Sequence, residues 1–168
     1  FNRTPLHLAA MNNRVAAVRI LLSSFDIDVN AKNNAGQTAL ERAADSGFHE
    51  IVSLLLNSKD IEINSADGLG WTPLHSASSR GHYEAVKLLM NHPMIEINKR
   101  RVLGVFIKFI NRTALHDAAD RGHSNILKLL LSHPEIEINT KDDSLNTALQ
   151  WCVDREKIET ARILLNDP

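Results

Sequence analysis

The phrase Thr4-Pro5-Leu6-His7-Leu8-Ala9 recurs four more times along the chain in the form Thr-(Pro/Ala)-Leu-x-x-(Ala/Cys). The copies are spaced by 34, 34, 41 and 34 residues, beginning at Thr4, Thr38, Thr72, Thr113 and Thr147. A fixed period of roughly 20 to 50 residues is typical of a repeat array, in which each unit buries its apolar surface by stacking on its neighbours. The sequence therefore predicts a stack of related units rather than one central core.

Each copy of the phrase has the features of a helix start. Thr is a favourable N-cap, and Pro suits the first helical position, as in Thr4-Pro5 and Thr72-Pro73. The helices are expected to end at residues that tolerate a left-handed backbone, namely Asn13, Gly47, Gly81 and Gly122. A second, almost wholly apolar helix is predicted in each unit, over 17–22, 51–56, 85–90, 126–131 and 160–165. Because such a helix must lie between neighbours, we predict an all-α repeat solenoid.

An extended stretch that ends in Asn follows the second helix in four units. Ile or Val alternates there with acidic residues, and polar segments with Gly follow, as at 32–36 and 66–70. This pattern predicts short β-turn fingers. The whole chain, 1–168, is thus read as one array with approximate repeats 1–30, 31–64, 65–98, 99–139 and an incomplete 140–168.

Composition excludes several kinds of partner. The chain carries 19 Lys and Arg against 20 Asp and Glu, so it lacks the clustered positive charge that is typical of nucleic-acid binding. No apolar run approaches the roughly 18 residues needed to span a bilayer. The single cysteine, Cys152, cannot form an internal disulfide, which favours a reducing setting in the cytoplasm or the nucleus. We expect neither nucleic acid nor membrane as a partner.

Catalytic and metal-binding motifs are not found in the sequence. The eight histidines recur with the repeat, which is not the local spacing of a zinc site, and no second cysteine completes a mixed cluster. The chain has no nucleophile elbow, Walker phosphate loop or Gly-x-Gly-x-x-Gly. Cys152 stands where other units have Ala, which predicts a small buried thiol. We therefore expect no enzymatic activity, no cofactor and no metal.

The repeated phrases resemble the ankyrin repeat family over essentially the whole chain. The resemblance rests on TPLHLAA (4–10), TPLHSAS (72–78), TALHDAA (113–119), two Gly-His pairs and the Leu-rich second helix. Tetratricopeptide repeats have a similar period, but they lack the Thr-Pro-Leu-His opening and the finger that ends in Asn. The resemblance implies a monomeric stack of antiparallel helix pairs with β-hairpin fingers, whose concave groove binds other proteins.

The resemblance also implies which residues contact a partner, because finger and first-helix positions vary while the framework repeats. These predicted contact residues are Gln37, Arg42, Asp45, Trp71, Ser79, Arg80, Arg112, Asp117, Asp120, Arg121, Trp151, Asp154 and Arg155. Trp and Arg dominate the energetics of interfaces, so the first candidates for anchors are Trp71, Trp151, Arg80, Arg112 and Arg121. The alternative for the two tryptophans is packing against neighbouring repeats.

The resemblance gives a role to the His of the phrase, present at His7, His75 and His116. It implies a hydrogen bond to the Thr of the same unit and another to the backbone of a neighbouring finger. Glu41 and Gln150 replace this His in the second and fifth units. We therefore expect those two junctions to be softer, with faster amide hydrogen exchange than the others.

A further implication of the resemblance concerns modification of the fingers. Four asparagines match the motif that a 2-oxoglutarate-dependent asparaginyl hydroxylase modifies in ankyrin fingers: Asn30, Asn64, Asn98 and Asn139. A mass increase of one oxygen atom would reveal it. The alternative is that these residues serve only to close the turn.

One finger departs from the period. Seven more residues lie between Asn98 and Thr113 than in the other fingers, and the enlarged finger, 99–112, holds five cations and no acid. A basic, apolar hairpin here would contact an acidic and partly hydrophobic partner. Its predicted contact residues are Arg100, Arg101, Phe106, Lys108 and Arg112. The alternatives are an idle loop and a stretch of intron retained in the gene sequence.

These observations predict a scaffold for protein–protein interaction that forms part of a longer protein. The alternative is a regulatory array that acts in cis on an enzyme, channel or effector domain outside this segment. The apolar residues 163–165 would need a polar cap or another unit to cover them, so we expect further repeats on both sides.

Overall fold

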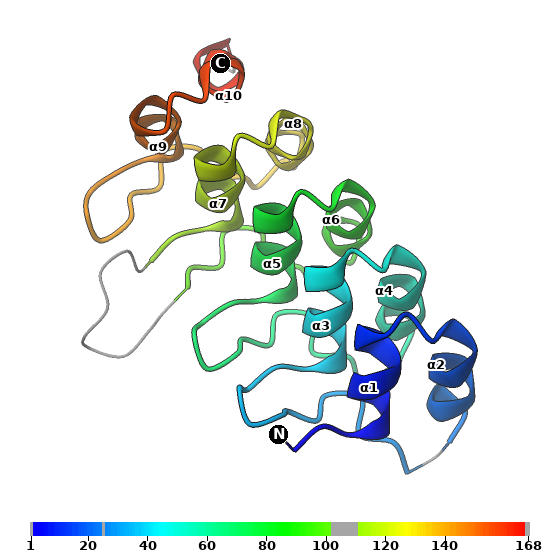
Figure 1. Cartoon of the computed structure of the whole chain (residues 1–168). Coiled ribbons are helices and arrows are strands. Elements are labelled where there is room, and N and C mark those ends of the chain that lie inside the picture. Colours follow the sequence, from blue (N-terminus) through cyan, green and yellow to red (C-terminus); the bar gives the residue numbers. More distant parts are fainter. Residues whose placement is uncertain (1, 25, 102–110, 167–168) are drawn as a thin grey trace.

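The computed structural model describes residues 2–24, 26–101 and 111–166. Within them ten helices form five antiparallel pairs, and each pair packs against the next (Figure 1). The first helices of the pairs form one row and the second helices another, with the fingers projecting on the side of the first row (Figure 1). The bounds are α1 (Pro5–Met11), α2 (Val15–Leu22), α3 (Ala39–Ser46), α4 (His49–Leu56), α5 (Pro73–Arg80), α6 (Tyr83–Met90), α7 (Ala114–Arg121), α8 (Ser124–Leu131), α9 (Ala148–Asp154) and α10 (Ile158–Asn166). The all-α repeat solenoid is confirmed.

Most of the first helices begin and end at the capping residues that the sequence predicts. Thr4 and Thr72 each form a complete capping box with the His three residues later, and Thr147 does so with Gln150. The first helices of the second, third and fourth units end at Gly47, Gly81 and Gly122, whose φ angles are 73°, 85° and 76°. In the fifth unit Glu156 takes the left-handed conformation, with φ of 54°. No glycine signals that turn, so the sequence did not reveal it.

The His of the phrase couples adjacent units, as the resemblance implies. Its Nδ1 contacts the Thr of its own unit and its Nε2 reaches a carbonyl of the next finger. The Nε2 distances are 2.8 Å from His7 to Gln37, 3.1 Å from His75 to Arg112 and 3.2 Å from His116 to Asn146, in each case to the backbone oxygen. Every such bond crosses a junction between units and thereby connects adjacent repeats.

The Gly-His pairs make a second connection, which runs back to the preceding unit. The Nε2 of His82 lies 3.0 Å from the carbonyl oxygen of Asp45, and that of His123 lies 3.1 Å from the carbonyl oxygen of Ser79. A Cβ on Gly47 would lie 2.5 Å from the His82 ring. Glycine is therefore required at Gly47 both by its positive φ and by this close approach.

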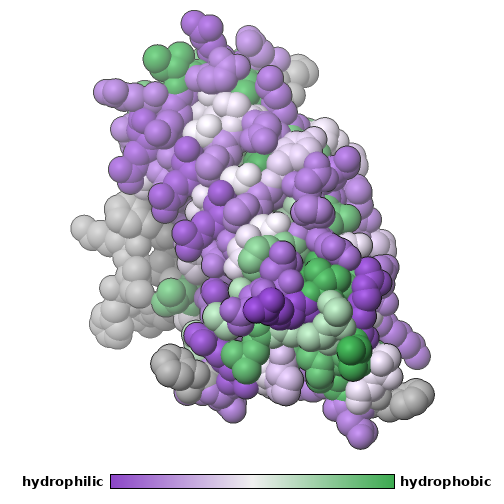
Figure 2. Space-filling view, turned by 45° about the vertical axis from the view of Figure 1, so that its right-hand side comes forward, coloured by the Kyte–Doolittle hydropathy of each residue, from purple (hydrophilic) through white to green (hydrophobic). Residues whose placement is uncertain are grey.

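The end of the array at the first unit exposes apolar surface. Ile20 is 71% exposed, whereas its counterparts one and two repeats later, Leu54 and Leu88, are half-buried in the stack. A hollow beside Ile20 is lined by Leu8, Ala9, Ala17 and Leu21, among others. Figure 2 shows hydrophobic residues gathered at this lower end of the molecule. Further repeats beyond it remain a prediction.

The fingers close through a backbone hydrogen bond at a constant place in the repeat. The bonds run from Asn33 N to Gln37 O (3.0 Å), from Asp67 N to Trp71 O (2.9 Å) and from Asp142 N to Asn146 O (2.9 Å). They close reverse turns, and no strand occurs in the described ranges, so the predicted β-hairpins are turns without a strand ladder. In the enlarged finger, Arg101 N bonds to Arg112 O at 2.9 Å. This finger therefore closes in register, and residues 102–110 lie outside the described residues.

Candidate functional site

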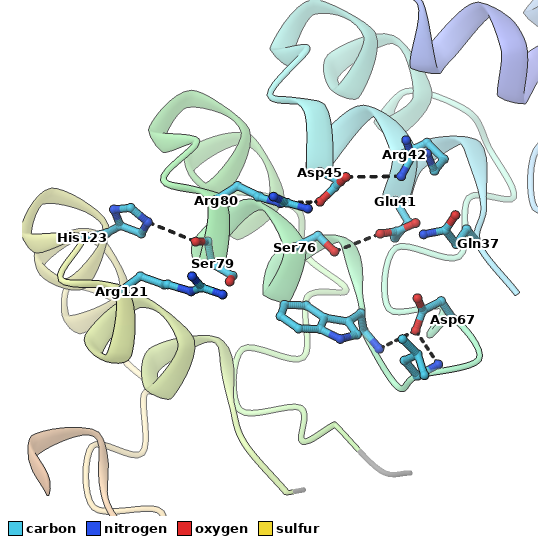
Figure 3. A pocket seen from close by; sticks show the side chains of 12 residues that line it. Gln37, Glu41, Arg42, Asp45, Asp67, Ser76, Ser79, Arg80, Arg121 and His123 are labelled. Atoms are coloured by element: carbon cyan, nitrogen blue, oxygen red, sulfur yellow. Dashed lines mark hydrogen bonds and ion pairs between the residues drawn. The ribbon is translucent and has the colours of Figure 1, made fainter. Parts of the chain in front are cut away.

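A groove lies on the inner face of the array, between the finger at 67–71 and helices α3, α5 and α7. It encloses about 560 Å³ and combines residues of three consecutive units. The lining consists of Gln37, Glu41, Arg42, Asp45, Asp67, Leu69, Trp71, Ser76, Ser79, Arg80, Arg121 and His123 (Figure 3). The structure thus brings together seven of the predicted contact residues, namely Gln37, Arg42, Asp45, Trp71, Ser79, Arg80 and Arg121.

Most charged groups of the groove already have partners. The Asp45 carboxylate accepts hydrogen bonds from Arg42 Nη1 at 3.3 Å and from Arg80 Nε at 2.9 Å, one from each side (Figure 3). Asp67 Oδ1 accepts from the backbone N–H of Leu69 and of Trp71, both at 2.8 Å. Asp45 therefore binds two neighbouring units together, and Asp67 shapes its own finger.

Glu41 differs from these groups because it is buried and uses only one of its two carboxylate oxygens. Its side chain is 3% exposed, Oε1 accepts from the Ser76 hydroxyl at 2.9 Å, and Oε2 has no hydrogen-bond partner among the described residues. Burial raises the pKa of Glu41 to about 7, an effect that Ser76 opposes and that Asp67 and Asp45 reinforce. The sequence showed only that an acid replaces His here. That replacement predicts a softer junction, and it gives no sign that the side chain lines the groove.

A second arrangement of charges lies where the enlarged finger meets α7 and α9. We call it the Asp117 cluster, formed by Arg101, Arg112, Asp117, Asp120 and Arg155. Asp117 Oδ1 lies 2.9 Å from Arg101 Nη2 and 3.4 Å from Arg112 Nε. Asp120 lies 3.1 Å from Arg112 Nη2 and 2.9 Å from Arg155 Nε. Two carboxylates therefore hold three guanidinium groups from the finger and the last unit.

The two tryptophans complete this cluster. The Arg101 guanidinium stacks over Trp71 at 4.1 Å from the ring centre, and that of Arg112 stacks over Trp151 at 4.3 Å. Trp151 also donates its indole N–H to Asp142 at 2.8 Å. Trp151 is buried, as in the packing alternative, whereas Trp71 is half-buried and lines the groove on the other side.

Besides Trp151, three predicted contact residues of this cluster are placed inside the molecule. Arg101 is 9% exposed, Arg112 6% and Asp117 3%. Burial raises the pKa of Asp117 to about 6, although Arg101 and Arg112 oppose the rise. Because these groups face one another and not the solvent, we assign them a role in positioning the enlarged finger. A deletion that tests that finger should accordingly keep Arg101 and Arg112.

Comparison with known protein families agrees with this geometry. The sequence model "Ankyrin repeats (3 copies)" matches residues 1–67 and 103–168, and "Ankyrin repeat" matches residues 69–101. The chain belongs to the ankyrin repeat family. A search of curated proteins gives no match to this ankyrin array.

The remaining predicted contact residues of the ankyrin array lie at its surface or outside the described residues. Asp154 and Arg155 are exposed at the end of α9, and Arg100 is exposed before the enlarged finger. Phe106 and Lys108 fall outside the described residues. Of the five cations in that finger, Arg101 and Arg112 are paired inside the Asp117 cluster and Lys99 contacts Glu96 at 2.9 Å. The prediction of an acidic partner at this finger therefore depends on only two of its cations, Arg100 and Lys108.

The finger asparagines of the ankyrin array bridge consecutive fingers. Asn30 donates to Asp60 O at 2.6 Å and accepts from Glu62 N at 2.9 Å. Asn64 and Asn98 repeat the pattern with Met94 and Glu96 and with Glu135 and Glu137. Among the described residues Asn139 makes no such bridge and is exposed. The structure thus assigns a stacking role to the first three, and hydroxylation of the four stays a prediction.

No group of three or more His, Cys, Asp or Glu side chains in the described ranges is placed to hold a metal ion. None of the helices in these ranges has the length and apolar character needed to cross a membrane.

Proposed function

We propose that this ankyrin array binds a partner protein through the groove between α3, α5 and α7. Ankyrin repeats are interaction modules and are typically not catalytic. The observation that carries the proposal is the convergence of seven predicted contact residues from three units on one hollow. Arg80 and Arg121 are exposed at its edge, where an incoming chain would first meet them.

The test is capture of partners by variants of the array. Arg80→Ala combined with Arg121→Ala alters the groove, while Lys87→Ala combined with Lys128→Ala removes two exposed charges from the outer helices α6 and α8. A partner that binds through the groove should be retained by the wild-type chain and the outer variant and lost by the groove variant. Equal retention by all three proteins would contradict the proposal.

The partner can be a separate protein or, in the cis-regulatory alternative, another domain of the same polypeptide. Adding that polypeptide's remaining segments in trans would distinguish the two, since a cis partner competes with the captured protein. We further propose a monomeric array in a reducing compartment, the cytoplasm or the nucleus, because the only cysteine, Cys152, is fully buried and gives no intermolecular disulfide. An acidic partner at the enlarged finger remains a separate prediction.

A further inference from the structure

The starting point is the change of residue at the His position of the second unit. A His ring donates from Nε2 to the next finger's carbonyl, as His75 does to Arg112 O. In its ionised form Glu41 has no proton to donate, so this form cannot make the equivalent bond to a carbonyl oxygen. Its side chain turns to Ser76 instead, and Oε2 is left without a partner among the described residues.

A buried carboxylate with an open oxygen is costly unless a donor reaches it. The two arginines nearest in the lining do not do so, because Arg42 and Arg80 are both bound to Asp45. No guanidinium or ammonium group of the described residues forms an ion pair with Glu41. The free chain therefore retains a buried acceptor with unused capacity at the wall of the groove.

The shape and the charge of this wall indicate the missing donor. Glu41, Ser76 and Trp71 all line the groove, and the carboxylates of Asp45 and Asp67 lie close enough to act on Glu41. A long, flexible stem can pack along the Trp71 ring while its charged end reaches the carboxylate. We infer that this groove takes a Lys or Arg side chain of the partner protein, with its cationic group paired to Glu41 Oε2; the inference rests on the proposed function.

The free state also suggests how the site responds to pH. The carboxyl of Glu41 has a pKa of about 7 in a setting formed by Ser76 from α5, Asp67 from the finger, and Asp45 and Arg42 from α3. A cation binds the ionised form, so binding lowers this pKa and releases a proton. Affinity should therefore rise as the pH increases through 7. Oε2 is shielded from water in the free chain, so entry needs a rotamer change, which is common at interfaces.

The experiment selects ligands without assuming their sequence. A random peptide library displayed on phage is panned against the whole 168-residue chain, with a Ser79→Trp variant, which fills the groove with a large side chain and keeps its charges, as the counter-selection. Each selected peptide is then synthesised in two forms, one with its basic residue and one with a neutral replacement, citrulline for Arg or norleucine for Lys. Affinities of both forms are measured for the wild type and for Glu41→Gln, Glu41→His and Asp154→Asn.

Neutralising the basic residue should weaken binding to the wild type about tenfold or more, and by about twofold at most in the two Glu41 variants. Asp154→Asn, which removes an exposed acid outside the groove, should behave as the wild type. Glu41→His restores the residue of the first, third and fourth units, so one non-acidic variant folds even if Gln does not.

The failures of the two proposals are distinguishable. If panning gives no peptide that depends on the groove, the proposed function fails and the inference fails with it. Groove-dependent peptides without a basic residue would overturn the inference alone. So would basic peptides whose neutralisation costs as much in Glu41→Gln and Glu41→His as in the wild type, because the cation would then pair elsewhere.

Discussion

Two buried carboxylates on the inner helices, Glu41 on α3 and Asp117 on α7, are equally hidden from solvent and differ in their partners. Each is 3% exposed. Asp117 lies between the guanidinium groups of Arg101 and Arg112, whereas Glu41 has one hydroxyl, that of Ser76. Burial alone therefore does not decide the role of a carboxylate in this array. Each carboxylate keeps one buried oxygen without a hydrogen-bond partner, Oδ2 in Asp117 and Oε2 in Glu41. The difference is that the charge of Asp117 is paired with two guanidinium groups, whereas Glu41 lies at the wall of the groove without an ion pair.

The largest effect is expected from breaking the closed cluster. Asp117→Ala leaves the buried Arg101 and Arg112 without their shared carboxylate, which should lower the free energy of unfolding by about 3–5 kcal/mol. Urea unfolding would measure it, with Asp154→Ala on the exposed side of α9 as the control. A loss similar to that of the control would show that the cluster does not stabilise the array.

The raised pKa of Glu41 should make the free energy of unfolding depend on pH. Between its ordinary pKa of 4.5 and its folded value of about 7, Glu41 binds more protons in the folded chain than in the unfolded one, so stability falls as pH rises through this window. Glu41→Gln lacks this penalty. Its stability relative to the wild type should increase by up to about 3 kcal/mol between pH 4.5 and about pH 8.

Urea unfolding of both proteins across this range is the measurement, with Asp154→Asn as the matched loss of one charge. Asp117, whose pKa is also raised by burial, titrates in both proteins and cancels in the difference. A difference that does not change with pH would mean that Glu41 is ionised throughout and has a cationic partner in the free chain.

A smaller effect is expected at Trp71, which lies between the groove and the Asp117 cluster. Trp71 lines the groove, and the guanidinium group of Arg101 stacks on its ring. A double-mutant cycle of Trp71→Leu and Arg101→Gln should give a coupling energy of about 1 kcal/mol. Unfolding of the four proteins supplies the value. Additive losses would show that the ring contributes its packing alone.

The smallest effect is expected at the edge of the groove. The ion pair of Arg80 with Asp45 is solvent-exposed on the arginine side, so Arg80→Ala should change the free energy of unfolding by less than about 1 kcal/mol. Thermal unfolding checks this at low and high salt. A loss as large as that of Asp117→Ala would remove the distinction between exposed and buried pairs.

Much of the fold could be predicted from local chemistry. The Thr caps and the glycines at helix ends each depend on a few residues near one another in the repeat, so periodicity reveals them. The His bonds between units follow instead from the resemblance to ankyrin repeats. The left-handed turn at Glu156 could not be predicted in this way, because no glycine stands there. Seven of the twelve residues that line the groove were predicted, through the variable finger and first-helix positions that the resemblance to ankyrin repeats implies.

The sequence by itself determined the period, the helix pairs and the positions left to vary, because a unit that cannot bury its apolar faces alone must stack on its neighbours. Only the tertiary structure decided which variable side chains meet one another. The sequence predicts that Arg101 and Arg112 contact an acidic partner, whereas stacking places them against Asp117 and Asp120. Glu41 lines the groove without an ion pair of its own, which the repeat pattern does not show. Pairing depends on distances across units, which a repeating pattern does not encode.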